Sequence, residues 1–242
     1  MTATPVGMRC PECARQRTKV KTARTLHGDP TLTYILIGVN VAVLLGEMLS
    51  GAGATGGFGG SEIVAQGALY GPAVAHGDLW RLLTAGFLHA GLIHLLFNMY
   101  VLYILGTMLE PSIGRLRFGL IYFVSLLCGS LGVLILSPNQ VTLGASGAVF
   151  GLMAAAVVVM RSRGVNPMQS GLPMWIGINL LITFALPNIS IGGHIGGLIG
   201  GAIVALLLFD LPERVRLPQV AAAVLAGAIG AAAVVASVVI VG

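Results

Sequence analysis

The sequence predicts an all-α polytopic membrane protein, and its composition excludes the other broad classes. Only 9% of the 242 residues are charged, whereas an ordinary soluble domain carries roughly 25%. Hydrophobic residues make up 56% of the chain, so a soluble fold could not bury its apolar surface. Disorder requires low hydrophobicity and high charge, and collagen requires a triplet repeat that the 35 glycines do not form.

Seven apolar segments predict membrane helices, since about 20 largely apolar residues cross the hydrocarbon core. They lie at about 31–50, 92–109, 115–136, 146–161, 172–187, 192–210 and 219–241. The first follows a long basic lead, so we do not interpret it as a cleaved signal sequence. The last is almost entirely Ala, Val, Gly and Ile, and we expect it to be an added helix outside any site.

The basic residues predict the orientation of these spans. If seven spans alternate, 12 of the 13 Lys and Arg residues fall on one side of the membrane, and only Arg81 falls on the other. The positive-inside rule then places the N-terminus in the cytoplasm and the C-terminus outside. Basic residues that flank apolar spans set the topology of a membrane protein. We therefore expect the lipid bilayer as a partner of this chain, and no nucleic acid.

Two connections between the spans have a distinctive composition. Residues 51–91, predicted to be external, form too long a segment for a simple connection. This segment begins rich in glycine and becomes apolar and aromatic, so we expect part of it to lie in the membrane interface. Residues 210–218 are charged and bounded by proline, and we expect a cytoplasmic turn there.

Polar residues inside membrane spans are costly, which makes them functional candidates. His89, His94 and Asn98 form a His-x4-His-x3-Asn group that enters the second span. His94 and Asn98 are four residues apart and therefore share one helical face. His89 precedes the helix and could fold back toward them. We expect the remaining membrane serines, Ser125, Ser130 and Ser237, to bond back to their own helices.

A Gly-x-Ser-Gly motif, formed by Gly144, Ser146 and Gly147, enters the fourth span. Small neighbours let a substrate carbonyl group approach a serine hydroxyl. The backbone N–H groups and the positive end of the dipole at a helix N-terminus suit a developing oxyanion. The motif is typical of a nucleophile turn, although it also arises by chance in a chain this rich in glycine.

His194 enters the sixth span, followed by Gly197 and Gly201. Two small residues four apart let another helix come very close, and we expect that neighbour to be the fourth span. The second, fourth and sixth spans all run inward, so their polar groups lie at one depth in the outer part of the membrane. The pairing would bring His194 to Ser146.

A serine hydroxyl is a poor nucleophile until a base takes its proton. His194 is the natural base for Ser146, and we predict a Ser–His dyad without a third carboxylate. Glu47, near the outer end of the first span, is the only carboxylate close by, and we assign it no role. His89 and Asn98 would then donate to the oxyanion, together with the Ser146 N–H.

These motifs, in this order and on these spans, make the chain resemble the rhomboid family of intramembrane serine proteases over about residues 31–210. Trp80 and Arg81 also match a Trp-Arg pair in the first long loop of the family. The resemblance implies a rhomboid-like six-helix bundle, to which this chain adds one C-terminal transmembrane helix. It implies no cofactor, and the expected location is the plasma membrane of a bacterium.

The resemblance also assigns roles to individual residues. Ser146 would be the nucleophile and His194 the general base, while the Ser146 N–H, His89 and Asn98 would line the oxyanion hole. His94 would support that hole. Supporting roles also fall to Gly144, Gly147, Phe150, Gly197 and Gly201, and to Trp80 and Arg81 at the interface of loop and membrane.

Phe150 stands where relatives often carry a Tyr that packs on the catalytic His. A Phe keeps the ring and loses the hydroxyl, so we expect activity to survive. The implied substrates are transmembrane helices of single-pass or polytopic proteins, cut near the outer membrane face. Such helices must unwind at the cut, because a helical peptide bond is shielded and its carbonyl is already bonded.

The sequence divides into a basic cytoplasmic tail (1–30), a protease core (31–210), and a linker with the seventh helix (211–242). Cys10 and Cys13 form a C-x-x-C knuckle in the tail. Zinc needs four ligands, and only His27 could be added, so we expect no metal there.

Two other functions remain open at this point. A rhomboid-like protein can bind transmembrane helices without cutting them, as a chaperone or quality-control factor. Such proteins usually lack the Ser or the His, and both are present here. A transporter could use the histidines as proton relays, but the chain has no inverted repeat and no acidic residue at mid-membrane.

Overall fold

The computed structural model describes residues 2–4, 7–9, 28–53, 61–185 and 189–242. Cys10, Cys13 and His27 lie outside the described residues, so the expectation for the C-x-x-C knuckle stays a prediction. The described part is almost entirely helical. Its strands are β1 (Thr2–Thr4) and β2 (Gly7–Arg9), which pair antiparallel in the tail.

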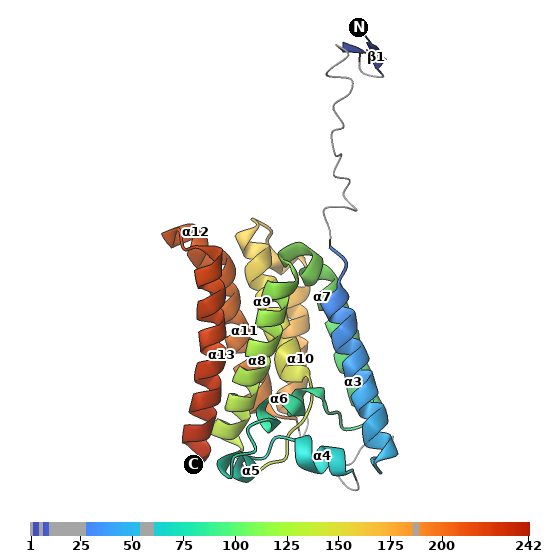
Figure 1. Cartoon of the computed structure of the whole chain (residues 1–242), viewed down its shortest axis with the longest axis vertical. Helices are drawn as coiled ribbons and strands as arrows, with labels where there is room; N and C mark the ends of the chain where they lie inside the picture. Colours follow the sequence, from blue (N-terminus) through green and yellow to red (C-terminus); the bar gives the residue numbers. More distant parts are fainter. Residues whose placement is uncertain (1, 5–6, 10–27, 54–60, 186–188) are drawn as a thin grey trace.

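Seven helices coincide with the seven predicted spans (Figure 1). They are α3 (Thr31–Leu49), α7 (Leu92–Ile113), α8 (Arg115–Leu136), α9 (Ser146–Ser162), α10 (Leu172–Ala185), α11 (Ile191–Ala205) and α13 (Gln219–Val241). Among the described residues, five helical segments are long and apolar enough to cross a membrane: α3, α7, α8, α13 and the segment Ile191–Val215. The helices α9 and α10 are apolar but shorter.

The predicted turn at 210–218 is wrong over most of its length, because the chain stays helical. A π-helical turn, η3 (Leu206–Asp210), follows α11 and leads into α12 (Leu211–Val215). Pro212 lies in the first turn of α12, the part of a helix in which proline is best tolerated. Arg216, in the left-handed conformation at φ 54°, ends the helix.

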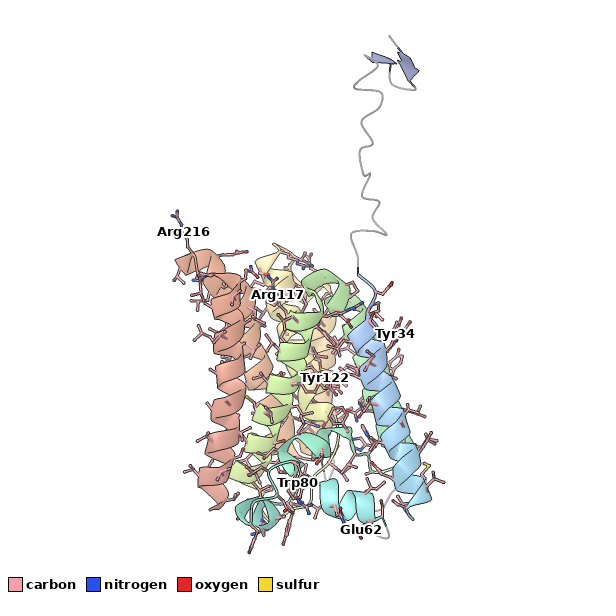
Figure 2. All side chains as sticks on the ribbon, in the orientation of Figure 1. Tyr34, Glu62, Trp80, Arg117, Tyr122 and Arg216 are labelled. Atoms are coloured by element: carbon pink, nitrogen blue, oxygen red, sulfur yellow. The ribbon has the colours of Figure 1, made fainter. Side chains whose placement is uncertain are left out.

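The two ends of the bundle differ in the residues that they carry. The start of α3 and the C-terminus of α13 lie at opposite ends (Figure 1). Arg117, Arg216 and Tyr34 lie toward the end where α3 begins, whereas Trp80 lies at the other end (Figure 2). An odd number of alternating spans requires this separation of the chain ends.

The first span is tied to the second by a buried carboxylate. Glu110 of α7 is 1% exposed and accepts hydrogen bonds from the backbone N–H groups of Leu32 and Thr33, at 2.8 and 2.7 Å. It also accepts one from the Thr33 hydroxyl at 2.7 Å. Because the first N–H groups of a helix have no partner within it, Glu110 supplies the N-terminal cap that α3 lacks.

The segment between α3 and α7 folds into short helices: α4 (Glu62–Gly67), α5 (Gly71–Ala75), α6 (Arg81–Thr84) and η1 (Ala85–Phe87). Arg81 joins them by donating to the carbonyl groups of Ala65 and Ala68, at 2.8 and 2.9 Å. Trp80 donates its indole N–H to the backbone carbonyl oxygen of Gln66 at 3.2 Å. Its half-exposed ring lies at the end of the bundle opposite to the start of α3 (Figure 2). Both residues hold the loop together.

Ser130 fastens this loop to the bundle. Its buried hydroxyl, on α8, donates to the carbonyl group of Leu82 in α6 at 2.7 Å. The expectation that Ser130 bonds back to its own helix is therefore wrong. Ser237 does bond back, to the carbonyl oxygen of Ala233 at 2.8 Å. The expectation is also wrong for Ser125, whose hydroxyl has no hydrogen-bond partner within the described residues.

One close contact of the bundle joins α9 to α11 through glycine. A Cβ atom on Gly197 would overlap the backbone of Gly147, and one on Gly201 would overlap the backbone of Gly151. The two backbones therefore touch, and the predicted pairing of the fourth and sixth spans is present. In a membrane this close packing is a main source of helix association.

Replacing Gly197 with Ala should lower the stability of the protein. The added methyl group has no space, and overpacking of this kind costs about 1–3 kcal/mol, which corresponds to a fall in Tm of roughly 5 °C. Gly227→Ala on α13 is the matched control, because its Cβ would meet nothing within 4 Å. Thermal unfolding in detergent measures both variants, and equal Tm values would contradict the glycine contact.

Candidate active site

A cavity of about 670 Å³ lies among α7, α8, α9, α10 and α11. Four of the residues singled out in the sequence for chemistry line it: Ser146, His194, His94 and Asn98. They come from three helices that start at the same end of the bundle, as the alternating topology requires. A concave, mostly apolar space with a few converging polar groups is the usual form of a binding or catalytic site.

Ser146 and His194 are hydrogen-bonded, with 2.7 Å between the serine Oγ and the histidine Nε2. Ser146 is the first residue of α9, and His194 lies in the first turn of α11. The hydroxyl of Ser190 caps α11 by accepting from the Gly193 N–H at 3.1 Å. The two helix N-termini thus meet, and the glycine contact below them sets their separation.

His194 is held on two further sides. The ring of Phe150 stacks on it with 4.2 Å between centroids and 19° between the planes, as expected for an aromatic residue one turn after Ser146. The Nδ1 atom of His194 is 2.7 Å from the hydroxyl of Thr183 on α10. Thr183 was not singled out in the sequence, where a threonine in an apolar helix carries no signal of its own.

His94 presents a hydrogen-bond donor to the cavity. Its Nδ1 accepts from the Ala90 N–H at 3.3 Å, so the neutral ring carries its proton on Nε2. The Nε2 edge lies beside Gly144, where a Cβ atom would stand only 3.1 Å from Nε2. Gly144 also has a φ of 128°, which disfavours any side chain at this position.

Asn98 lies one turn below His94 on the same face of α7. Its amide group donates to the His94 carbonyl at 2.9 Å, and the side chain is nearly buried. An amide carries two hydrogens, so the second can donate to a ligand in the cavity. Asn98 therefore lines the same cavity as Ser146.

His89 does not line the cavity, although the sequence suggested that it would and that His94 would only support it. His89 is 2% exposed, and its ring lies behind His94, with 5.1 Å between centroids. Its backbone N–H donates to the fully buried Glu47 carboxylate at 3.2 Å. Glu47, to which no role was assigned, thus connects α3 to the turn before α7.

Burial, and to a smaller extent the neighbouring His94 ring, lowers the pKa of His89 to about 3. The His89 imidazole is therefore neutral in the folded protein at ordinary pH. In the unfolded chain its pKa returns toward 6.5, so between these two values only the unfolded state binds the proton. The free energy of unfolding therefore falls as the pH decreases below about 6.5.

Acidification should accordingly lower the Tm of the protein in detergent, and His89→Gln should reduce that dependence. The contribution of His89 is about 2 kcal/mol between about pH 7.5 and about pH 5. His76→Gln, at an exposed loop histidine, is the control and should keep the wild-type slope. Identical slopes in the wild type and His89→Gln would contradict the burial of a neutral imidazole.

Comparison with known proteins places the chain in a family. The Rhomboid domain model matches residues 76–211, more than half of the chain. The Rhomboid protease GluP of Bacillus subtilis (strain 168) is 36% identical over 201 residues, which cover 82% of this chain and 38% of that protein. RHOMBOID-like protein 7 of Arabidopsis thaliana is 36% identical over 159 residues, 63% of this chain.

The aligned regions differ in how much of each relative they cover. The Putative rhomboid protease YdcA of the same Bacillus is 35% identical over 149 residues, which cover 60% of this chain and 75% of that protein. This chain spans half or less of the length of GluP and of RHOMBOID-like protein 7. The family match, the helical membrane fold and the order of the motifs agree, and the chain belongs to the rhomboid family.

Proposed function

We propose that the chain is an intramembrane serine endopeptidase. The observation that carries this proposal is the 2.7 Å hydrogen bond between Ser146 Oγ and His194 Nε2 within a cavity of the membrane domain. Membership of a family with relatives named rhomboid proteases supports protease activity at the family level.

The proposed chemistry begins at the dyad. His194 Nε2 takes the proton of the Ser146 hydroxyl while Oγ attacks the carbonyl carbon of the substrate peptide bond. The protonated imidazole then gives that proton to the leaving amine, and an acyl-enzyme remains on Ser146. Water, activated by the same imidazole, hydrolyses the acyl-enzyme and restores the serine.

Three donors stabilise the oxyanion in this proposal. The first is the Ser146 N–H, which stands at the N-terminus of α9, where the helix itself provides no partner. The second is the Nε2–H of His94, and the third is the Asn98 amide. We assign to His94 the role expected for His89 from the sequence, because His94 lines the cavity and His89 lies behind it.

The proposed substrates are transmembrane helices of single-pass or polytopic membrane proteins. The positive-inside rule makes the end that carries Arg117 and Arg216 cytoplasmic, so Trp80 and the start of α9 lie toward the outside (Figure 2). Cleavage would therefore occur near the outer face of a bacterial plasma membrane. The catalytic unit would comprise residues 31–210, with the tail 1–30 and the segment 211–242 as additions.

A fluorescent fluorophosphonate probe, which reacts with activated serines, tests the dyad in detergent-purified protein. The wild type should label, and Ser146→Ala and His194→Ala should not, because one lacks the nucleophile and the other the base. Ser237→Ala, at a serine that bonds back to its own helix on α13, is the matched control and should label normally. All variants should keep the wild-type Tm within a few degrees.

Asn98→Ala should reduce the labelling rate by about 100-fold and leave some activity, because two other oxyanion donors remain. Well-folded wild-type protein that fails to label would overturn the protease proposal. It would favour instead a rhomboid-like protein that binds transmembrane helices without cutting them. Loss of folded protein in all three site variants would make these residues structural.

A further inference from the structure

Thr183 connects the candidate base to α10 through two hydrogen bonds. Its hydroxyl oxygen is 2.7 Å from His194 Nδ1 and 2.8 Å from the carbonyl oxygen of Asn179, one turn earlier in α10. The Thr183 side chain is 2% exposed and the His194 side chain 8% exposed. Both bonds are therefore formed away from bulk water, where an unpaired polar group is expensive.

The direction of each hydrogen bond follows from counting protons. A carbonyl oxygen can only accept, so the single hydroxyl proton of Thr183 is donated to Asn179. The Thr183 oxygen must then accept a proton from His194 Nδ1. A neutral imidazole with its proton on Nδ1 has its lone pair on Nε2, and that atom faces the Ser146 hydroxyl.

We propose that Thr183 is a positioning residue that holds His194 in the tautomer able to accept the serine proton. The inference rests on the proposed function, because a tautomer matters only if His194 acts as a base. Thr183 is part of the cavity lining, but its hydroxyl bonds to His194 and Asn179 and not to Ser146. It acts through His194, because the Nδ1–H form is the one in which the Thr183 hydroxyl and both ring nitrogens of His194 are all paired.

The surroundings of α10 support a specific role for this contact. Asn179 and Thr183 are the buried residues of α10, and both are polar. The apolar side chains of Trp175, Leu181 and Phe184 are more than half exposed. Leu172 and Ile176 pack partly buried against the core, and the buried side chains of the helix are this polar pair, which brings an acceptor to His194.

Three variants separate the hydroxyl group from the bulk of the side chain. Thr183→Val keeps the shape and removes the oxygen, and Thr183→Ser keeps the oxygen and removes a methyl group. The matched control is Thr107→Val on α7, because Thr107 makes the same bond to the carbonyl four residues earlier, at 2.7 Å from Tyr103 O. Thr107 lies outside the cavity lining.

The first measurement is the tautomer of His194, by NMR of protein labelled with 15N only at histidine, at a pH where the ring is neutral. The signals of His194 are those that disappear in His194→Ala. The wild type, Thr183→Ser and Thr107→Val should show the proton on Nδ1. In Thr183→Val the proton should move toward Nε2, because Nδ1–H would face a methyl group while Nε2–H can still donate to Ser146.

The second measurement is the rate of fluorophosphonate labelling at neutral pH. Thr183→Val should react about fivefold to tenfold more slowly, as expected for the loss of one neutral hydrogen bond that favours the reactive tautomer. Thr183→Ser and Thr107→Val should react close to the wild-type rate. A structural loss caused by altered packing would impair Thr183→Ser as well.

Three results would overturn the inference. These are a wild-type His194 protonated on Nε2, a Thr183→Val protein with the wild-type tautomer and rate, or a Thr183→Ser protein as slow as Thr183→Val. The tautomer readout needs no catalysis. Wild-type protein that shows the Nδ1 tautomer but never labels would therefore sink the proposed protease and leave the Thr183 contact standing.

Discussion

The contact of glycine backbones between α9 and α11 is the constraint on which the site depends. Lipid is as apolar as the helix surfaces, so burial alone does not hold two membrane helices together. Direct contact of backbones does, and it requires glycine at Gly197, where a Cβ atom would overlap the backbone of Gly147. Ser146 precedes one of these residues, and His194 precedes the other by less than a turn. The same contact that packs the helices therefore sets the 2.7 Å between serine and histidine.

The hydrogen bond made by Nδ1 makes Nε2 a donor in one histidine of the cavity and an acceptor in the other. His94 Nδ1 accepts from a backbone N–H, which leaves its Nε2 a donor to the cavity. His194 Nδ1 donates to a hydroxyl oxygen, which leaves its Nε2 an acceptor for Ser146. The two side chains are chemically identical and differ only in the partner of Nδ1. The turn before α7 supplies that partner to His94, and α10 supplies it to His194.

The sequence predicted the parts of this structure that depend on local pattern. The span at 115–136 is bounded as predicted, because Gly114 and Ser137 interrupt the apolar run. The glycine face of α11 and its neighbour followed from spacing and topology. Spacing could not say which of His89 and His94 enters the cavity. Nor could it find Glu47, whose partner His89 is 42 residues away, because that contact exists only after α3 packs against the loop.

A neutral acceptor behind the proposed base suits a site within a membrane. A carboxylate in this position would stabilise the imidazolium, but a buried charge is costly and is retained only with full hydrogen bonding. The Thr183 hydroxyl carries no charge, and its proton is committed to the Asn179 carbonyl, so its oxygen can only accept from His194. It fixes the orientation and the tautomer of the ring without adding an ion to the apolar interior. The proposed dyad would therefore be ordered as a triad is, with a helix hydroxyl as its third member.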